Sequence, residues 1–348
     1  MKANPGTFFE DFCIGQEIRH ATPRTVTVGD AALYIGLTGS RFALHSSDEF
    51  ARRLGLSAAP IDDLLVFHIV FGRTVPDISL NAIANLGYAN CRFGVPVHAG
   101  DTLATRSTVI GLKENSNRET GVVYVHSIGT NQRGAIVLDY VRWVMVRKRD
   151  RNSPAPEAVV PNLPARVSAA ELVIPETLDV AGYDMLAAGS PHRWADYQAG
   201  ERIDHVDGMT IEESCHMIAT RLYQNTARVH FNQHAEKGGR FGRRIVYGGH
   251  IISLARTLSF NGLGNAFRLA AINGGRHVAP SFAGDTIYAW SEVKEKVALA
   301  ERADIGALHM RTVAAKDHPC ADFPDTGVDG KPHADVVLDL DYWVLMPR

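Results

Sequence analysis

The stretch FEDFCIGQEI, residues Phe9–Ile18, recurs as WADYQAGERI, residues Trp194–Ile203, at an offset of 185. Both segments read as an aromatic residue, Asp, an aromatic residue, Gly, a polar residue and Ile. Further along, PVHAGDTL (Pro96–Leu103) recurs as PSFAGDTI (Pro280–Ile287) at an offset of 184. Landmarks that keep one order and nearly one offset indicate that the chain contains two copies of the same structural module.

A third pair of segments shows where the two copies differ in length. VLDYVRWVMV (Val137–Val146) resembles VLDLDYWVLM (Val337–Met346) at an offset of 200, which predicts an insertion late in the second copy. HPCADFPDTGVDGKPH (His318–His333) has the composition of such a loop, and the proline-rich NSPAPEAVVPNLPARV (Asn152–Val167) is typical of a linker. We therefore expect an N-terminal repeat over 1–150, a linker over 151–185 and a C-terminal repeat over 186–348.

Each copy combines one apolar helical stretch with long strands that follow it. The helical stretches are DDLLVFHIVFG (Asp62–Gly72) and GGHIISLARTLSF (Gly248–Phe260). TLATRSTVIGL (Thr102–Leu112) and GVVYVHSIGTN (Gly121–Asn131) have the β-branched alternation of strands. This order predicts an α+β fold in which each half wraps an antiparallel sheet around a central helix. Two such sheets can pair their edges and so cover otherwise open strands.

Composition limits the classes of function. The 348 residues carry 36 Lys and Arg against 38 Asp and Glu, so no global charge points to nucleic acid or a membrane surface. The four cysteines are far apart, which favours neither a zinc site nor a disulfide framework. No phosphate-binding glycine motif and no apolar run of signal or membrane-span length occurs. We expect a cytoplasmic protein with no bound metal and no separate cofactor.

Two corresponding segments resemble a known catalytic motif. YIGLTGSRFALH (Tyr34–His45) and ATRLYQNTARVHFN (Ala219–Asn232) are similar to the motif of MaoC-like, (R)-specific enoyl-CoA hydratases. That motif reads aromatic, Thr or Ser, Gly, Asp, any residue, Asn, Pro, aliphatic, His. The AGDT segments, Ala99–Thr102 and Ala283–Thr286, resemble the same family's Pro-Gly-Asp-Thr strand opening. The resemblance implies a tandem, or double, hot-dog fold.

A longer part of the first half resembles a more specific group within these hydratases. Residues 39–55 and 62–93 are similar to the double hot-dog mesaconyl-CoA hydratases, also called β-methylmalyl-CoA dehydratases. This resemblance implies a hydro-lyase that reversibly hydrates a short branched enoyl-CoA bearing a free carboxylate. It also implies that coenzyme A enters only as part of the substrate, that no nucleic acid or membrane partner is needed, and that the protein forms a homodimer.

The resemblance assigns catalytic roles in the second half. His230 occupies the motif's His, Asn225 stands five residues earlier in the Asp position, and Gly248 follows Asn225 at the family spacing. In the family the Asp and His hold and activate water, and a backbone N–H at the helix start receives the thioester oxygen. Asn does not titrate near neutral pH, so His230 must exchange the proton while Asn225 orients the water. Asn225 could instead cap the turn, and Gly248 could simply form a tight turn.

The first half keeps only part of this pattern. Ser40 and His45 occupy the Asp and His positions, and Asp63 replaces the helix-start glycine. A carboxylate there would repel an enolate oxygen. We therefore expect the chemistry in the second half and retain Ser40 and His45 as a secondary site. The other histidines, among them His277, are interpreted as structural residues.

Several arginines are candidates for binding the substrate's charges. Arg228, Arg256 or Arg41 could bind the acyl carboxylate through a guanidinium fork. Arg243 and Arg244, in a glycine-rich loop, could contact the phosphates of coenzyme A or could simply be solvated.

Three other functions remain open at the level of the sequence. They are an (R)-specific hydratase of ordinary enoyl-CoA, an acyl-CoA thioesterase and a non-catalytic acyl-CoA-binding protein. The replaced motif Asp and Pro argue against the first, and activity that depends on His230 would argue against the last.

Overall fold

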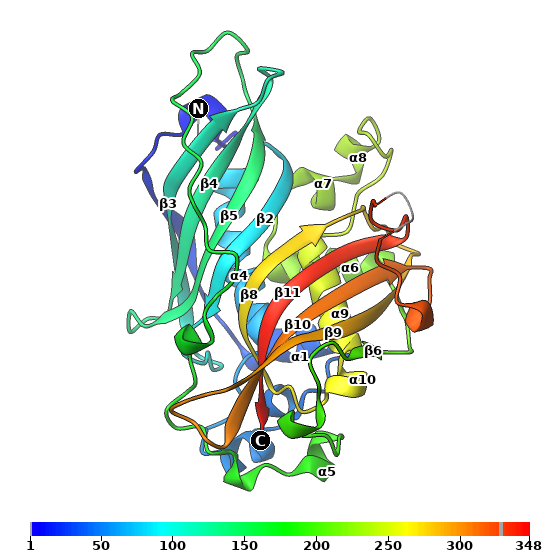
Figure 1. Cartoon of the computed structure of the whole chain (residues 1–348). Coiled ribbons are helices and arrows are strands. Elements are labelled where there is room, and N and C mark those ends of the chain that lie inside the picture. Colours follow the sequence, from blue (N-terminus) through cyan, green and yellow to red (C-terminus); the bar gives the residue numbers. More distant parts are fainter. Residues whose placement is uncertain (1, 327–329) are drawn as a thin grey trace.

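The computed structural model describes residues 2–326 and 330–348 and has the predicted α+β architecture. Each half contributes an antiparallel sheet that curves around one long helix (Figure 1). The first-half sheet has the spatial order β1 (Glu17–Thr25), β3 (Thr102–Glu114), β4 (Thr120–Thr130), β5 (Ile136–Arg147) and β2 (Ala82–Phe93). The second-half sheet continues as β8 (Arg268–His277), β11 (Val336–Pro347), β10 (Ile305–Lys316), β9 (Thr286–Ala298) and β6 (Arg202–Asp204), with β7 (Met209–Thr210) also on β9.

The two sheets join through their inner edges into one continuous sheet. Strands β2 and β8 pair antiparallel, with Cys91 opposite Ile272 and Arg92 opposite Ala271. This junction confirms the expected pairing of edges, because each half covers a strand edge that the other would leave open. The seam therefore lies beside the region where the two central helices meet (Figure 1).

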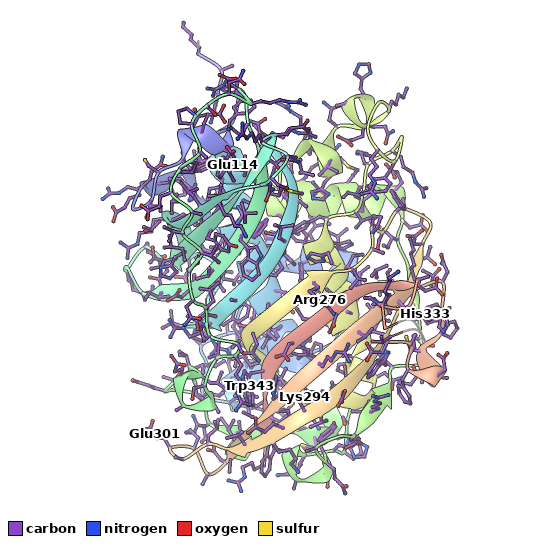
Figure 2. All side chains as sticks on the ribbon, turned by 45° about the horizontal axis from the view of Figure 1, so that its top comes forward. Glu114, Arg276, Lys294, Glu301, His333 and Trp343 are labelled. Carbon is purple, nitrogen blue, oxygen red and sulfur yellow. The ribbon has the colours of Figure 1, made fainter. Side chains whose placement is uncertain are left out.

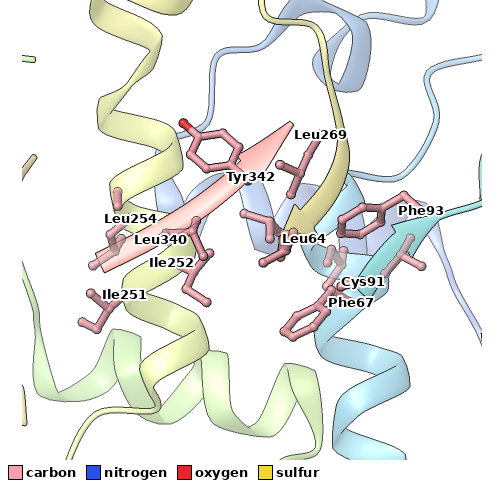
Figure 3. Close-up of a cluster of buried hydrophobic side chains, with 14 of the residues drawn as sticks. Leu64, Phe67, Cys91, Phe93, Ile251, Ile252, Leu254, Leu269, Leu340 and Tyr342 are labelled. Carbon is pink, nitrogen blue, oxygen red and sulfur yellow. The ribbon is translucent and has the colours of Figure 1, made fainter. Parts of the chain in front are cut away.

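The central helices are α4 (Asp63–Thr74) and α9 (Gly248–Leu258). Both are buried along nearly their whole length, which explains their almost unbroken apolar sequences. Figure 3 shows Leu64 and Phe67 of α4 and Ile251, Ile252 and Leu254 of α9 in one cluster with Leu340 and Tyr342 of β11. The two halves thus share a single core instead of folding around separate ones.

Shorter helices close the open side of each half. The first half adds α1 (Val28–Thr38), α2 (Ala43–Ser46), α3 (Asp48–Arg53), the 3-10 turn η1 (Phe9–Asp11) and the π-helical turn η2 (Val75–Ser79). The second half adds α6 (Glu213–Tyr223), α7 (Arg228–Phe231), α8 (Gln233–Glu236), α10 (Phe260–Leu263), η5 (Trp194–Asp196) and η6 (Cys320–Asp322). None of the described helices is long and apolar enough to cross a membrane.

The segment expected to be a linker runs along the outer side of the sheet (Figure 1). It contains only η3 (Ala169–Glu171), η4 (Val180–Gly182) and the start of α5 (Met185–Ala188). Trp343 of β11 donates its indole N–H to the carbonyl of Val167, and Val159 bridges to Leu112 of β3. The linker is therefore tied to both halves. The additional length of the second half lies between β10 and β11, as the change in offset predicted.

Candidate functional site

The second-half motif lies in the loop that follows α6. The helix ends at Tyr223, the C-cap residue Gln224 turns the chain with a φ of 54°, and Asn225 comes next with only 1% of its surface exposed. The Asn225 Oδ1 atom accepts a hydrogen bond of 3.2 Å from the Ala227 N–H, so this side chain does stabilise the turn. Its Nδ2 group is buried and has no hydrogen-bond partner among the described residues. The Oδ1 end of the amide is thus held by the backbone, while the Nδ2 end is free to donate a hydrogen bond to a ligand.

His230 lies in α7, five residues beyond Asn225. Its Nδ1 atom donates to the Ile245 carbonyl at 3.1 Å, because a carbonyl can only accept. Burial lowers the pKa of His230 to about 4, and this hydrogen bond opposes the shift. At neutral pH the imidazole is therefore uncharged with its lone pair on Nε2. No described residue hydrogen-bonds to Nε2, so this atom can accept a proton from water.

Helix α9 begins at Gly248, in the segment VYGGH. The first N–H groups of a helix have no partner within it and carry the positive end of its dipole. A Cβ atom on Gly248 would lie 2.5 Å from ring atoms of His277, a distance that real side chains do not tolerate. Glycine is thus required here because the His277 ring packs directly against the helix start.

Four aromatic residues that the sequence analysis did not select as site residues complete the surroundings of Gly248. His277 ends β8, and its Nε2 lies 3.3 Å from the Tyr88 hydroxyl of β2. Burial, followed by the proximity of His230, lowers the pKa of His277 to about 4. Tyr247 packs between His230 and Phe71, at ring-centroid distances of 5.6 and 5.7 Å. Since Tyr88 and Phe71 belong to the first half, the site lies between the two halves.

The corresponding place in the first half is filled by an ionic cluster. His45 donates its Nδ1 proton to the Pro60 carbonyl at 3.1 Å, as His230 does to Ile245. Its Nε2, however, faces the Asp63 carboxylate at 3.9 Å, and Asp63 also lies 3.7 Å from Nε of Arg268. The remaining cavity is about 10 Å³, too small for a thioester. Ser40 is buried beside it, and its N–H donates to Thr38 Oγ1.

The three arginines expected at the acyl carboxylate lie in different places. Arg228 is exposed on α7. Arg256 is buried over the Phe42 ring at 3.7 Å and donates to the Ala266 carbonyl, which places it at the first-half cavity and away from Gly248. Arg41 stacks on Phe260, whose ring packs against Phe42. Only Arg228 therefore lies on the same element as His230.

The two arginines expected at the coenzyme A phosphates also differ in environment. Arg243 is exposed and stacks over Phe282 at 3.9 Å. Arg244 is held against α6, where it donates to the Glu213 carboxylate and contacts the sulfur of Met217. Arg243 is the better placed of the two to meet a phosphate.

A cavity of about 340 Å³ opens beside the motif loop. Thr226 and Phe231 line it from the second half, and Gly72 and Arg73 line it from the first. Its volume is within the usual range for small-molecule sites. It gives a bound molecule room beside Thr226 and Phe231, the residues that directly follow Asn225 and His230 in the chain.

A possible metal-ligand set lies elsewhere, in the inserted loop. Possible ligand atoms of His318, His333 and Asp335 lie within 4.8 Å of one another. Figure 2 shows His333 at the outer rim of the second-half sheet. His318 is hydrogen-bonded to the carboxylates of Asp322 and Asp335, which accounts for most of this cluster without an ion.

The whole chain is similar to proteins of one family. Residues 2–322 match the family described as mesaconyl-CoA hydratase. The β-methylmalyl-CoA dehydratase of Chloroflexus aurantiacus is 67% identical over 100% of this chain and 99% of that protein. The mesaconyl-CoA hydratase of Cereibacter sphaeroides is 60% identical over the full length of both proteins.

Solved structures agree with this relationship. A MaoC domain protein dehydratase from Chloroflexus aurantiacus has a TM-score of 0.98 at 67% identity and covers 100% of this chain and 99% of its own. A double hot-dog protein from Mycobacterium tuberculosis has a TM-score of 0.76 at 26% identity and covers 99% of both chains. These likenesses confirm the double hot-dog fold. With matches in sequence and structure over its whole length, the chain belongs to the mesaconyl-CoA hydratase family.

Proposed function

We propose that this protein catalyses the reversible addition of water to mesaconyl-CoA, which gives β-methylmalyl-CoA. The observation that carries the proposal is a neutral His230, with an available Nε2, close to His277, whose ring packs on the Gly248 helix start. The equivalent first-half place is filled by Asp63 and Arg268. The names and high identities of the two bacterial relatives support the choice of substrate.

The reaction follows from the chemistry of these groups. His230 Nε2 takes a proton from water while the water oxygen bonds to C3 of the enoyl thioester, and the protonated His230 then returns that proton to C2. Electron density moves to the thioester oxygen during the addition. An N–H at the start of α9 stabilises that developing charge, because it is fixed in place and partly sheltered from water. Asn225 donates from Nδ2 to orient the water, and His277 positions the helix start.

The Asn at position 225 suits a substrate that is itself charged. Mesaconyl-CoA carries a free carboxylate, and an Asp within a few ångströms would repel it. An amide keeps a hydrogen-bond donor and acceptor at that place without adding a second negative charge. Arg243 remains our proposed contact for a coenzyme A phosphate. A homodimer, a cytoplasmic location, independence of any further cofactor and the boundaries of the two repeats also remain predictions.

The direct test is to incubate the purified protein separately with mesaconyl-CoA and crotonyl-CoA. We expect the enoyl absorbance of mesaconyl-CoA to fall and its mass to rise by one water, much faster than for crotonyl-CoA. Hydration of crotonyl-CoA alone would indicate an ordinary enoyl-CoA hydratase. Release of free coenzyme A without hydration would indicate a thioesterase, and no reaction would favour a binding protein.

Asn225→Asp should change the substrate preference. The new carboxylate would restore the family's usual acid–base pair, so kcat/KM for crotonyl-CoA should rise about tenfold. Repulsion should lower kcat/KM for mesaconyl-CoA by about tenfold, since like charges a few ångströms apart cost about 1 kcal/mol or more. Ser40→Asp, the corresponding change in the filled first-half place, should leave the ratio unaltered. If Asn225→Asp left the ratio of kcat/KM for the two substrates unaltered, Asn225 could not lie next to the bound substrate.

The acid limb of the pH–rate profile should lie unusually low. His230 acts as a base only when neutral, and its pKa is about 4 instead of the ordinary 6.5. We therefore expect kcat/KM to be constant from pH 7 to about 5 and to fall at lower pH, as the imidazole is protonated. A pH profile on a stable buffer series measures this directly. A midpoint near 6.5 would mean that the imidazole is well hydrated and not buried.

A further inference from the structure

Arg142 is a buried cation that has no carboxylate partner in the described part of the chain. It lies in the middle of β5 with 0% of its surface exposed, on the inner side of the first-half sheet. Its Nη2 donates to Thr74 Oγ1 at 2.7 Å and Ser79 Oγ at 3.3 Å, and its guanidinium stacks over Phe71 at 4.3 Å. Its Nε and Nη1 groups are buried and have no hydrogen-bond partner among the described residues.

Two other buried cations among the described residues lie close to a carboxylate, unlike Arg142. Arg268 lies 3.7 Å from the Asp63 carboxylate, and Lys148 lies 2.5 Å from that of Glu114. The ionisable groups that act on Arg142 are the hydroxyls of Tyr140, Tyr88 and Tyr247, which are neutral at physiological pH. A buried guanidinium with two free donor groups is costly to keep. A ligand that brings its own negative charge would remove that cost.

Packed aromatic side chains connect Arg142 to Gly248. Tyr88 is the residue opposite Arg142 in the pairing of β2 with β5, and its hydroxyl reaches His277, whose ring rests on Gly248. A second route runs through Phe71, which contacts both Arg142 and Tyr247. The buried Tyr247 hydroxyl also has no hydrogen-bond partner among the described residues. Arg142 of the first half and Tyr247 of the second half thus both have free hydrogen-bond donors near the start of α9.

We propose that Arg142 binds the free carboxylate of the acyl group and thereby sets the preference for dicarboxylate-derived enoyl thioesters. This inference rests on the proposed hydratase function and identifies how that site recognises its substrate. The free Nε–H and Nη1 groups point to different sides of the guanidinium, so a carboxylate oxygen accepts from one of them beside the full positive charge, and the Tyr247 hydroxyl is a further free donor. The equivalent position of the second half holds Tyr342, whose hydroxyl is already bonded to Thr312. At this pair of equivalent positions, the positive charge therefore occurs in the first-half sheet and not in the second-half sheet.

The test compares Arg142→Met with Arg228→Met on two substrates. In Arg142→Met, kcat/KM for mesaconyl-CoA should fall about 1,000-fold, while that for crotonyl-CoA, which has no carboxylate, should stay level or rise. Arg228→Met removes an exposed cation next to His230 and should change the ratio less than threefold. An unchanged ratio in Arg142→Met would overturn the proposal, as would a large change in Arg228→Met alone.

Thermal unfolding separates recognition from a structural role. The positive charge of Arg142 is uncompensated in the wild-type protein. Its removal in Arg142→Met should therefore leave Tm unchanged or raise it. Arg268→Met leaves the Asp63 carboxylate without its ion-pair partner and should therefore lower Tm. The ratio of kcat/KM for the two substrates should not change. A fall in Tm for Arg142→Met together with equal losses on both substrates would show that Arg142 serves only the fold.

A substrate-side measurement covers the case in which Arg142→Met does not fold. The wild-type protein should hydrate mesaconyl-CoA at least 100-fold faster than the methyl ester of its free carboxylate. Arg142→Lys, which keeps the charge but loses the planar guanidinium and its Nε–H donor, should reduce this preference. Less than tenfold discrimination by the wild-type protein would overturn the proposal. Failure of the proposed function is distinct, because the wild-type protein would then hydrate neither compound.

Discussion

His230→Ala should lower kcat for hydration of mesaconyl-CoA by about 1,000-fold with little change in KM. The imidazole is the group at this pocket that can accept the proton of water, and general bases typically contribute 10²–10⁴-fold. The Nδ1 bond to Ile245 fixes the tautomer, so no other arrangement of the ring supplies Nε2 at the same place. A steady-state assay of enoyl absorbance at saturating substrate measures the effect.

His45→Ala is the matched control, because His45 makes the corresponding bond to Pro60 but faces Asp63. This variant should keep kcat within about threefold of wild type. Its substrate ratio should also be unaltered. If His45→Ala abolished turnover while His230→Ala did not, the chemistry would have to be assigned to the first half.

Gly248→Ala should reduce kcat by about 100-fold and also destabilise the protein. The new methyl group would enter the space of the His277 ring, so either the ring or the first turn of α9 must move. Displacing the N–H from the thioester oxygen loses stabilisation that is worth about 10²–10³-fold in comparable sites. Overpacking in a buried place costs about 1–3 kcal/mol, which urea unfolding would detect.

Gly36→Ala provides the comparison for an ordinary helical glycine. Gly36 lies on α1, and an added Cβ would meet nothing within 4 Å. We expect unchanged kcat and equal or slightly greater stability, since Ala favours a helix over Gly by about 0.5–1 kcal/mol. Gly248→Ala with normal kcat would exclude an N–H of this turn as the group that stabilises the thioester oxygen.

The local signals in the sequence were sufficient for the architecture and the family. The recurrence of FEDFCIGQEI as WADYQAGERI and the two AGDT segments reflect the same strand and turn geometry built twice. The central helices could be recognised in the sequence because they lack the regularly spaced polar residues that give a surface helix its polar face. The change in offset located the insertion between β10 and β11, because added residues shift every later landmark equally.

The arginines show where reasoning along the chain fails. Arg256 lies eight residues beyond Gly248 in one helix, a rise of about 12 Å. That separation carries its guanidinium to Phe42 at the first-half cavity. Arg142, in contrast, is distant from Gly248 in sequence and reaches the pocket only through the folding of β5 against α4. An arginine within an apolar strand was the available signal, but strand periodicity alone does not say what the buried face contacts.

The sequence by itself determined the duplicated α+β fold, the position of the insertion and the candidates His230, Asn225 and Gly248, because each depends on contacts between residues near in the chain. Only the tertiary structure decided that the His277 ring packs on the helix start and that Arg142 is connected to it through Tyr88. These residues come from β8, β5 and β2, and they meet because the two sheets join along β2 and β8. Burial in that shared core also sets the charge of each group, since it depends on surroundings that no single segment contains.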